Sequence, residues 1–112
     1  MLIRFSSDAL AKVCNNSELL RRRWGVAKGL LLEKRLSQIG AMPNLHLVTA
    51  IPGILETPVR LTKKGELVAA VVLPLRLLFR VDHDPLPLHE NGDARCTEIH
   101  DLILMEVLDG SD

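Results

Sequence analysis

Residues 75–81 read Leu75-Arg76-Leu77-Leu78-Phe79-Arg80-Val81, and this stretch decides the fold. Leucine, phenylalanine and valine occupy every second position, and both arginines lie between them. Successive side chains of a β-strand point to opposite faces, so this alternation predicts a strand with one buried and one exposed face. A strand of this kind is typical of an antiparallel sheet that is covered on one side only.

The segments around this strand complete an α+β pattern. The N-cap oxygens of Ser6 and Ser7 predict a short helix over 8–14. Apolar residues at helical spacing predict a longer helix over 18–39, with a bend or break near Trp24-Gly25. Residues 44–54 look irregular, and residues 82–95 form a loop. The further predicted strands span 2–5, 59–62, 66–73 and 97–108. We therefore expect one domain over residues 1–112, with an N-terminal strand, a two-helix hairpin and an antiparallel β-meander.

The charged residues are sorted into two blocks, although the formal net charge is zero. Residues 1–80 carry thirteen Lys or Arg and five Asp or Glu, whereas residues 81–112 carry one Arg and nine Asp or Glu. A basic body suits a polyanionic partner. The acidic segment allows three interpretations: a solvated loop and strand, a shield over the basic sheet face, or a segment that repels nucleic acid and leaves a protein-binding module.

Other features exclude several classes of protein. The longest apolar run, residues 67–75, is too short to span a membrane and contains Pro74. Two cysteines make no disulfide framework, so we expect a cytoplasmic protein. His83, His89, Cys96 and His100 are spaced too loosely to predict a metal site, and we expect no metal and no small-molecule cofactor.

The chain resembles the RelE/ParE superfamily of type II toxin–antitoxin toxins, and most closely its HigB-like killer-protein branch. The matching motifs run through nearly the whole chain. They are Ile3-Arg4-Phe5, Leu10-Ala11-Lys12-Val13-Cys14, Trp24-Gly25, Arg35-Leu36 with Ile39, Asn44-Leu45, Pro52-Gly53, Lys64-Gly65-Glu66-Leu67, Arg76-Leu77-Leu78-Phe79, Asp84-Pro85-Leu86-Pro87 and Ile103-Leu104-Met105-Glu106-Val107-Leu108-Asp109.

The resemblance implies a RelE-like fold, a ribosome-dependent endoribonuclease that cuts messenger RNA (mRNA), and a cognate antitoxin that silences it. It also implies that the ribose 2′-OH attacks the adjacent phosphate, with Arg76 as the charge stabiliser and Arg60 as a second basic residue. From the strand pattern, Lys63, Lys64 and Arg80 are candidate RNA-binding residues beside them. His100, the one imidazole on a predicted strand, is the candidate general acid or base.

The sequence also departs from the family pattern. The killer branch commonly has a His before the Lys-Gly turn, where this chain reads Glu56-Thr57-Pro58, and commonly ends in Asp-Tyr-His or Asp-x-His. This chain ends in Asp109-Gly110-Ser111-Asp112 and contains no Tyr. A catalytically degenerate RelE-like module that binds other proteins is therefore the alternative. The gyrase-poisoning activity of ParE relatives has no specific residue support here.

Overall fold

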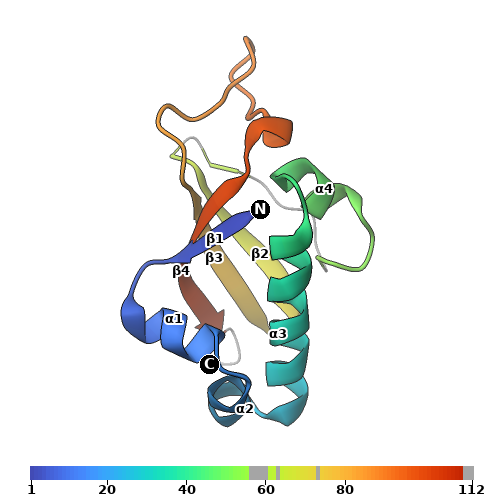
Figure 1. Cartoon of the computed structure of the whole chain (residues 1–112). Coiled ribbons are helices and arrows are strands. Elements are labelled where there is room, and N and C mark those ends of the chain that lie inside the picture. Colours follow the sequence, from blue (N-terminus) through green and yellow to red (C-terminus); the bar gives the residue numbers. More distant parts are fainter. Residues whose placement is uncertain (56–60, 63, 73, 110–112) are drawn as a thin grey trace.

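The computed structural model describes residues 1–55, 61–62, 64–72 and 74–109. Among these residues, four strands form one sheet in the order β1-β4-β3-β2, and four α-helices accompany it (Figure 1). The elements are β1 (Leu2–Phe5), α1 (Asp8–Cys14), α2 (Ser17–Trp24), α3 (Val26–Ala41), α4 (Leu45–Ala50), β2 (Glu66–Val72), β3 (Leu75–Val81), the 3-10 helix η1 (Cys96–Glu98) and β4 (Asp101–Asp109). The predicted α+β class is confirmed.

The sheet combines the predicted meander with one parallel edge. β2 pairs antiparallel with β3, and β3 pairs antiparallel with β4, which makes β4 an internal strand. β1 pairs in parallel with β4, so the first and last strands of the described chain lie side by side in the sheet. Phe79 lies between Leu67 of β2 and Leu104 of β4. A bulge between Leu78 and Phe79 shifts the register of the β3–β4 pair by one residue, because Leu78 pairs with Glu106 and Phe79 pairs with Leu104.

The buried face of the sheet carries the core. Leu75, Leu77, Phe79 and Val81 of β3 are all buried, as the alternation predicted. The helical side of the core comes from α2 and α3, with Leu20, Leu32 and Ile39 almost inaccessible to solvent. Figure 1 shows α3 running along this side of the sheet. The opposite face of the sheet carries the exposed residues of β3, Arg76 and Arg80.

Residues 18–39 divide into two helices at Gly25, within the segment where the sequence predicted a bend or break. Gly25 lies between them with φ of +88°, a left-handed backbone conformation that favours glycine. Asn16 begins α2, because its side-chain oxygen accepts a hydrogen bond from Leu19 N at 3.1 Å. Ser7 begins α1 in the same way, through Leu10 N. The break between α2 and α3 thus lies at Gly25, directly after Trp24.

Two further boundaries differ from the sequence-based prediction. Residues 44–54 are not wholly irregular, since Asn44 caps the six-residue helix α4 and accepts a hydrogen bond from Leu47 N at 3.0 Å. The last strand begins at Asp101 rather than at residue 97, because residues 96–98 form η1. Of the predicted strand over 59–62, residues 59 and 60 lie outside the described part; Leu61 forms an isolated bridge with Leu67.

No helix in the described part of the chain is both long enough and apolar enough to cross a lipid bilayer.

Candidate functional site

Arg76 and Arg80 lie on the sheet face that is turned away from the helices. Both are exposed, and both occupy the positions of β3 that alternate with its buried residues. Four residues of extended strand separate their Cα atoms by about 13 Å. Among the described residues, neither guanidinium forms an ion pair or a hydrogen bond. Two predicted site residues are thus placed on one accessible surface.

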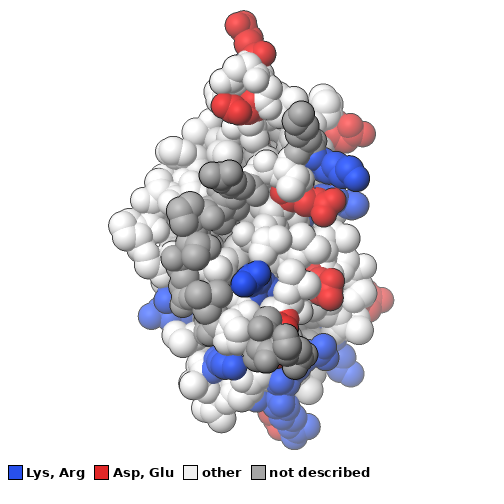
Figure 2. Space-filling model, turned by 180° about the vertical axis from the view of Figure 1, so that it is seen from behind, with Lys and Arg blue, Asp and Glu red and all other residues white. Residues whose placement is uncertain are grey.

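Carboxylates share this outer sheet face. The register places Glu66 of β2 opposite Arg80, and Glu106 of β4 opposite Leu78 between the two arginines. Figure 2, seen from behind, shows Lys and Arg atoms in separate patches with Asp and Glu atoms among them. The described part of the face is therefore mixed in charge, and the arginines act there as individual cations rather than as members of one uniformly basic field.

The predicted basic turn is described only in part. Lys64 is exposed directly before β2, in a turn where Gly65 N donates a hydrogen bond to Thr62 O at 3.0 Å. Gly65 has φ of +80°, and Thr62 Oγ1 accepts a hydrogen bond from Glu66 N. Arg60 and Lys63 lie outside the described residues. The structure thus places Lys64 at the end of β2 that is paired with the Arg80 end of β3.

His100 lies directly before β4 rather than within a strand, which corrects the predicted position. Its side chain is 61% exposed, and its Nδ1 lies 3.2 Å from Oδ2 of Asp101. This contact is an ion pair when the imidazole carries a proton on both ring nitrogens.

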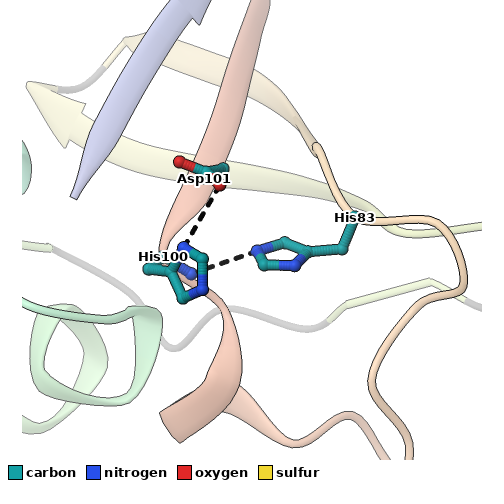
Figure 3. A group of neighbouring side chains, drawn as sticks. All are labelled: His83, His100 and Asp101. Atoms are coloured by element: carbon teal, nitrogen blue, oxygen red, sulfur yellow. Dashed lines mark hydrogen bonds and ion pairs between the residues drawn. The ribbon is translucent and has the colours of Figure 1, made fainter.

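His83 faces His100 across the ends of β3 and β4, and the sequence analysis did not pair them. Val81 pairs with Leu102, and Asp82 N donates a hydrogen bond to Asp101 O at 2.9 Å, so the next residue on each strand is a histidine. Nε2 of His83 accepts a hydrogen bond from the His100 backbone N–H at 3.3 Å. The ring centroids are 4.6 Å apart, at 73° (Figure 3).

Asp82 bears on the interpretation of the acidic segment as a shield over the arginines. Its Oδ2 lies 3.1 Å from Nη1 of Arg4 in β1, with the Arg4 side chain 64% exposed. Arg95, the one cation of the segment, pairs with Glu98. Within the described residues, no carboxylate of the segment pairs with Arg76 or Arg80. The described contacts therefore do not support shielding of these arginines by ion pairs.

The basic residues of α2 lie on another part of the molecule. Arg21, Arg22 and Arg23 are exposed, and Arg22 Nη2 lies 2.6 Å from Oε1 of Glu18 in the same helix. The Arg23 guanidinium lies 5.2 Å from the ring centroid of Trp24, a cation–π contact. Both residues line a hollow of about 300 Å³ that reaches Met105 and Val107 of β4. Trp24 packs against the core from its rim, in agreement with a structural role.

Comparisons with protein-family models, curated proteins and solved structures find no match to this chain. The resemblance to RelE/ParE toxins accordingly stays a prediction that rests on the motifs quoted above.

Proposed function

We propose that this chain is the toxin of a type II toxin–antitoxin system, a cytoplasmic endoribonuclease that cleaves mRNA on the ribosome and is silenced by a cognate antitoxin. The observation that carries the proposal is the placement of Arg76 and Arg80. Both guanidiniums are exposed on one sheet face and have no partner among the described residues. Free guanidinium groups bind phosphate oxygens through paired N–H donors.

Cleavage through the ribose 2′-OH requires a group that stabilises charge and groups that move protons. In the proposed mechanism Arg76 holds the scissile phosphate and offsets the negative charge that develops in the transition state. Arg80, Lys64 and the predicted residues Arg60 and Lys63 hold the neighbouring backbone. These roles require no metal ion and no organic cofactor.

Proton transfer by His100, the predicted general acid or base, does not fit the strand register. Arg76 lies opposite Leu108, whereas His100 directly precedes Asp101, so eight residues of extended strand, about 26 Å, separate His100 from the position beside Arg76. The 2′-OH lies next to the phosphate that it attacks, so His100 does not reach its proton while Arg76 holds that phosphate. The proposed mechanism therefore assigns charge stabilisation to Arg76 and assigns proton transfer to no described residue.

Inducible expression tests the proposed toxin function directly. We expect wild-type chain to arrest bacterial growth and to cleave mRNA on purified translating ribosomes, with the cut sites read by primer extension. Arg76→Ala should relieve the arrest and lower the cleavage rate by about 10²-fold or more, as loss of a transition-state donor does. Arg22→Ala, an exposed arginine of α2, should keep both activities. Failure of wild type to arrest growth or to cut mRNA would refute the nuclease.

A non-catalytic protein-binding module is the second candidate, and the surface of α3 favours it. Val26, Leu30 and Leu31 are 65%, 44% and 41% exposed, and Val26 and Leu30 are one helical turn apart. Exposed apolar side chains grouped on one helix are typical of an interface. If this candidate is right, wild-type chain is harmless, a partner co-purifies with it, and Leu30→Glu abolishes that association while Arg76→Ala does not.

A further inference from the structure

Three side chains with metal-binding atoms meet where β3 ends and β4 begins. One ligand atom from each of His83, His100 and Asp101 lies within 4.8 Å of the others (Figure 3). We propose that these residues form a binding site for one transition-metal ion of the zinc class, with two nitrogen ligands and one oxygen ligand. The sequence spacing did not predict this site, because His83 and His100 are distant in the chain and become neighbours only through the strand register.

The distances suit an ion of this size. Zinc lies about 2.0–2.2 Å from nitrogen and oxygen ligands, so the ligand atoms of a tetrahedral site are about 3.4 Å apart. Small rotations about the side-chain bonds would close the observed separation to that value. The rotation of His83 would exchange its hydrogen bond from His100 N–H, a contact of 3.3 Å, for a bond to the metal.

The donor set selects the class of metal. Imidazole nitrogens with one carboxylate favour zinc, nickel, cobalt or copper, whereas magnesium and calcium prefer oxygen ligands throughout. Three protein ligands leave at least one coordination position for water. The exposure of His100, whose side chain is 61% accessible, gives the ion a path from solvent.

The local charge balance also favours a cation. Two aspartates lie opposite each other here, because the backbone N–H of Asp82 donates a hydrogen bond to Asp101 O across the strands. Arg4 forms an ion pair with Asp82 at 3.1 Å. Asp101 then supplies a negatively charged oxygen ligand beside the two imidazoles, which favours a cation between them.

A bound metal ion would cross-link the two ends of the segment between β3 and β4. His83 stands at the start of that segment and His100 at its end. An ion held by both residues binds the folded chain and not the unfolded one, so the thermal midpoint rises as the free zinc concentration increases above the Kd. This effect does not depend on RNA cleavage, and it would be found equally in a chain without nuclease activity.

Calorimetric titration of the untagged, metal-free chain with zinc chloride tests the site. We expect one zinc ion per chain and a thermal midpoint that rises with zinc and returns with a chelator. Magnesium chloride should produce neither effect. His83→Ala, His100→Ala and Asp101→Asn should each weaken zinc binding by about tenfold or more. Loss of a residue that only supports a metal ligand already costs about tenfold in affinity, and loss of the ligand itself should cost at least as much.

The chain offers matched controls, because it contains two further histidines outside the cluster. His46 lies in α4 and His89 in the exposed segment before β4. His46→Ala and His89→Ala should bind zinc as wild type does. Asp101→Asn keeps the size of the side chain, so it separates loss of a ligand from loss of the fold. Absence of zinc binding, or equal weakening by His89→Ala and His83→Ala, would overturn the assignment.

Discussion

Gly29 of α3 lies directly against the backbone of Arg21 in α2. A Cβ atom built at position 29 would lie 2.9 Å from both Cα and N of Arg21, closer than real contacts allow. The two helices can approach this closely only because glycine lacks that atom. The short connection through Gly25 and this contact together determine the angle at which α3 packs against α2.

Gly29→Ala should therefore destabilise the protein, even though alanine is the better helix former. Backbone atoms cannot move aside as a flexible side chain can, so we expect a loss of about 1–3 kcal/mol in the free energy of unfolding. Gly40→Ala in the same helix is the matched control, since its Cβ would lie 3.9 Å from Ile3 Cδ1. The free energy of unfolding of that variant should rise by up to about 1 kcal/mol. Denaturant titration measures both, and an equal response would contradict the helix contact.

Phe79→Ala should lower the free energy of unfolding more than a substitution on the outer sheet face does. Phe79 is 1% exposed at the centre of the sheet, between Leu67 and Leu104. Removing the ring leaves a cavity and should lower the free energy of unfolding by about 3–5 kcal/mol. Val68→Ala on the neighbouring strand, where the side chain is 42% exposed, should cost less than about 1 kcal/mol. Thermal unfolding of both variants measures these losses. If Phe79→Ala and Val68→Ala lose comparable stability, the assignment of the core to the Phe79 face of the sheet is wrong.

The parts of the fold that sequence reasoning found are those with a local physical signal. In residues 75–81 every second residue is apolar and Arg76 and Arg80 lie at alternate positions, and β3 has the predicted bounds. Ser7 and Asp8 mark the beginning of α1 through capping. The helix α4 was missed because six residues are too few for a helical period to show. Its N-cap, Asn44, was the available signal.

The histidine cluster could not be predicted in the same way. Its formation depends on which residues of β3 and β4 lie opposite each other, and a bulge at Leu78/Phe79 shifts that register. The connection between Val81 and Asp101 is long, so turn chemistry does not fix the pairing. Arg76 and Arg80 were predictable as neighbours because they belong to one strand; His83 and His100 were not.

The proposed RNA contacts of Arg76 and Arg80 predict a specific salt dependence. Each contact between a cation and a single-stranded phosphate contributes about −0.7 to the slope of log affinity against log salt. The double variant Arg76→Ala/Arg80→Ala should therefore have a slope shallower by about 1.4 than wild type. Fluorescence anisotropy with a labelled oligoribonucleotide, from about 50 to 200 mM salt, measures it. An unchanged slope, or the same change in Arg22→Ala, would remove these arginines from the interface.

Cys14 should resist alkylation in the folded protein. Its side chain is 8% exposed in the core, and burial raises its pKa from 9.0 to about 11, against a smaller opposite effect of the Arg23 charge. The thiolate is the reactive form, so little of it is present near neutral pH. Cys96 is only half-buried, although burial raises its pKa as well. Mass spectrometry after iodoacetamide treatment should show Cys96 modified first; earlier modification of Cys14 would contradict the packing.

The same shift links stability to alkaline pH. The folded chain holds the Cys14 proton up to a pKa of about 11, whereas the unfolded chain releases it near 9.0. The contribution of the neutral thiol to stability is thus present in full below pH 9 and is lost as pH rises from 9 towards 11. Cys14→Ala removes this titration and leaves the others in place. Its free energy of unfolding should therefore fall less steeply than that of wild type across this window, and parallel profiles would show that the Cys14 thiol does not titrate differently on folding.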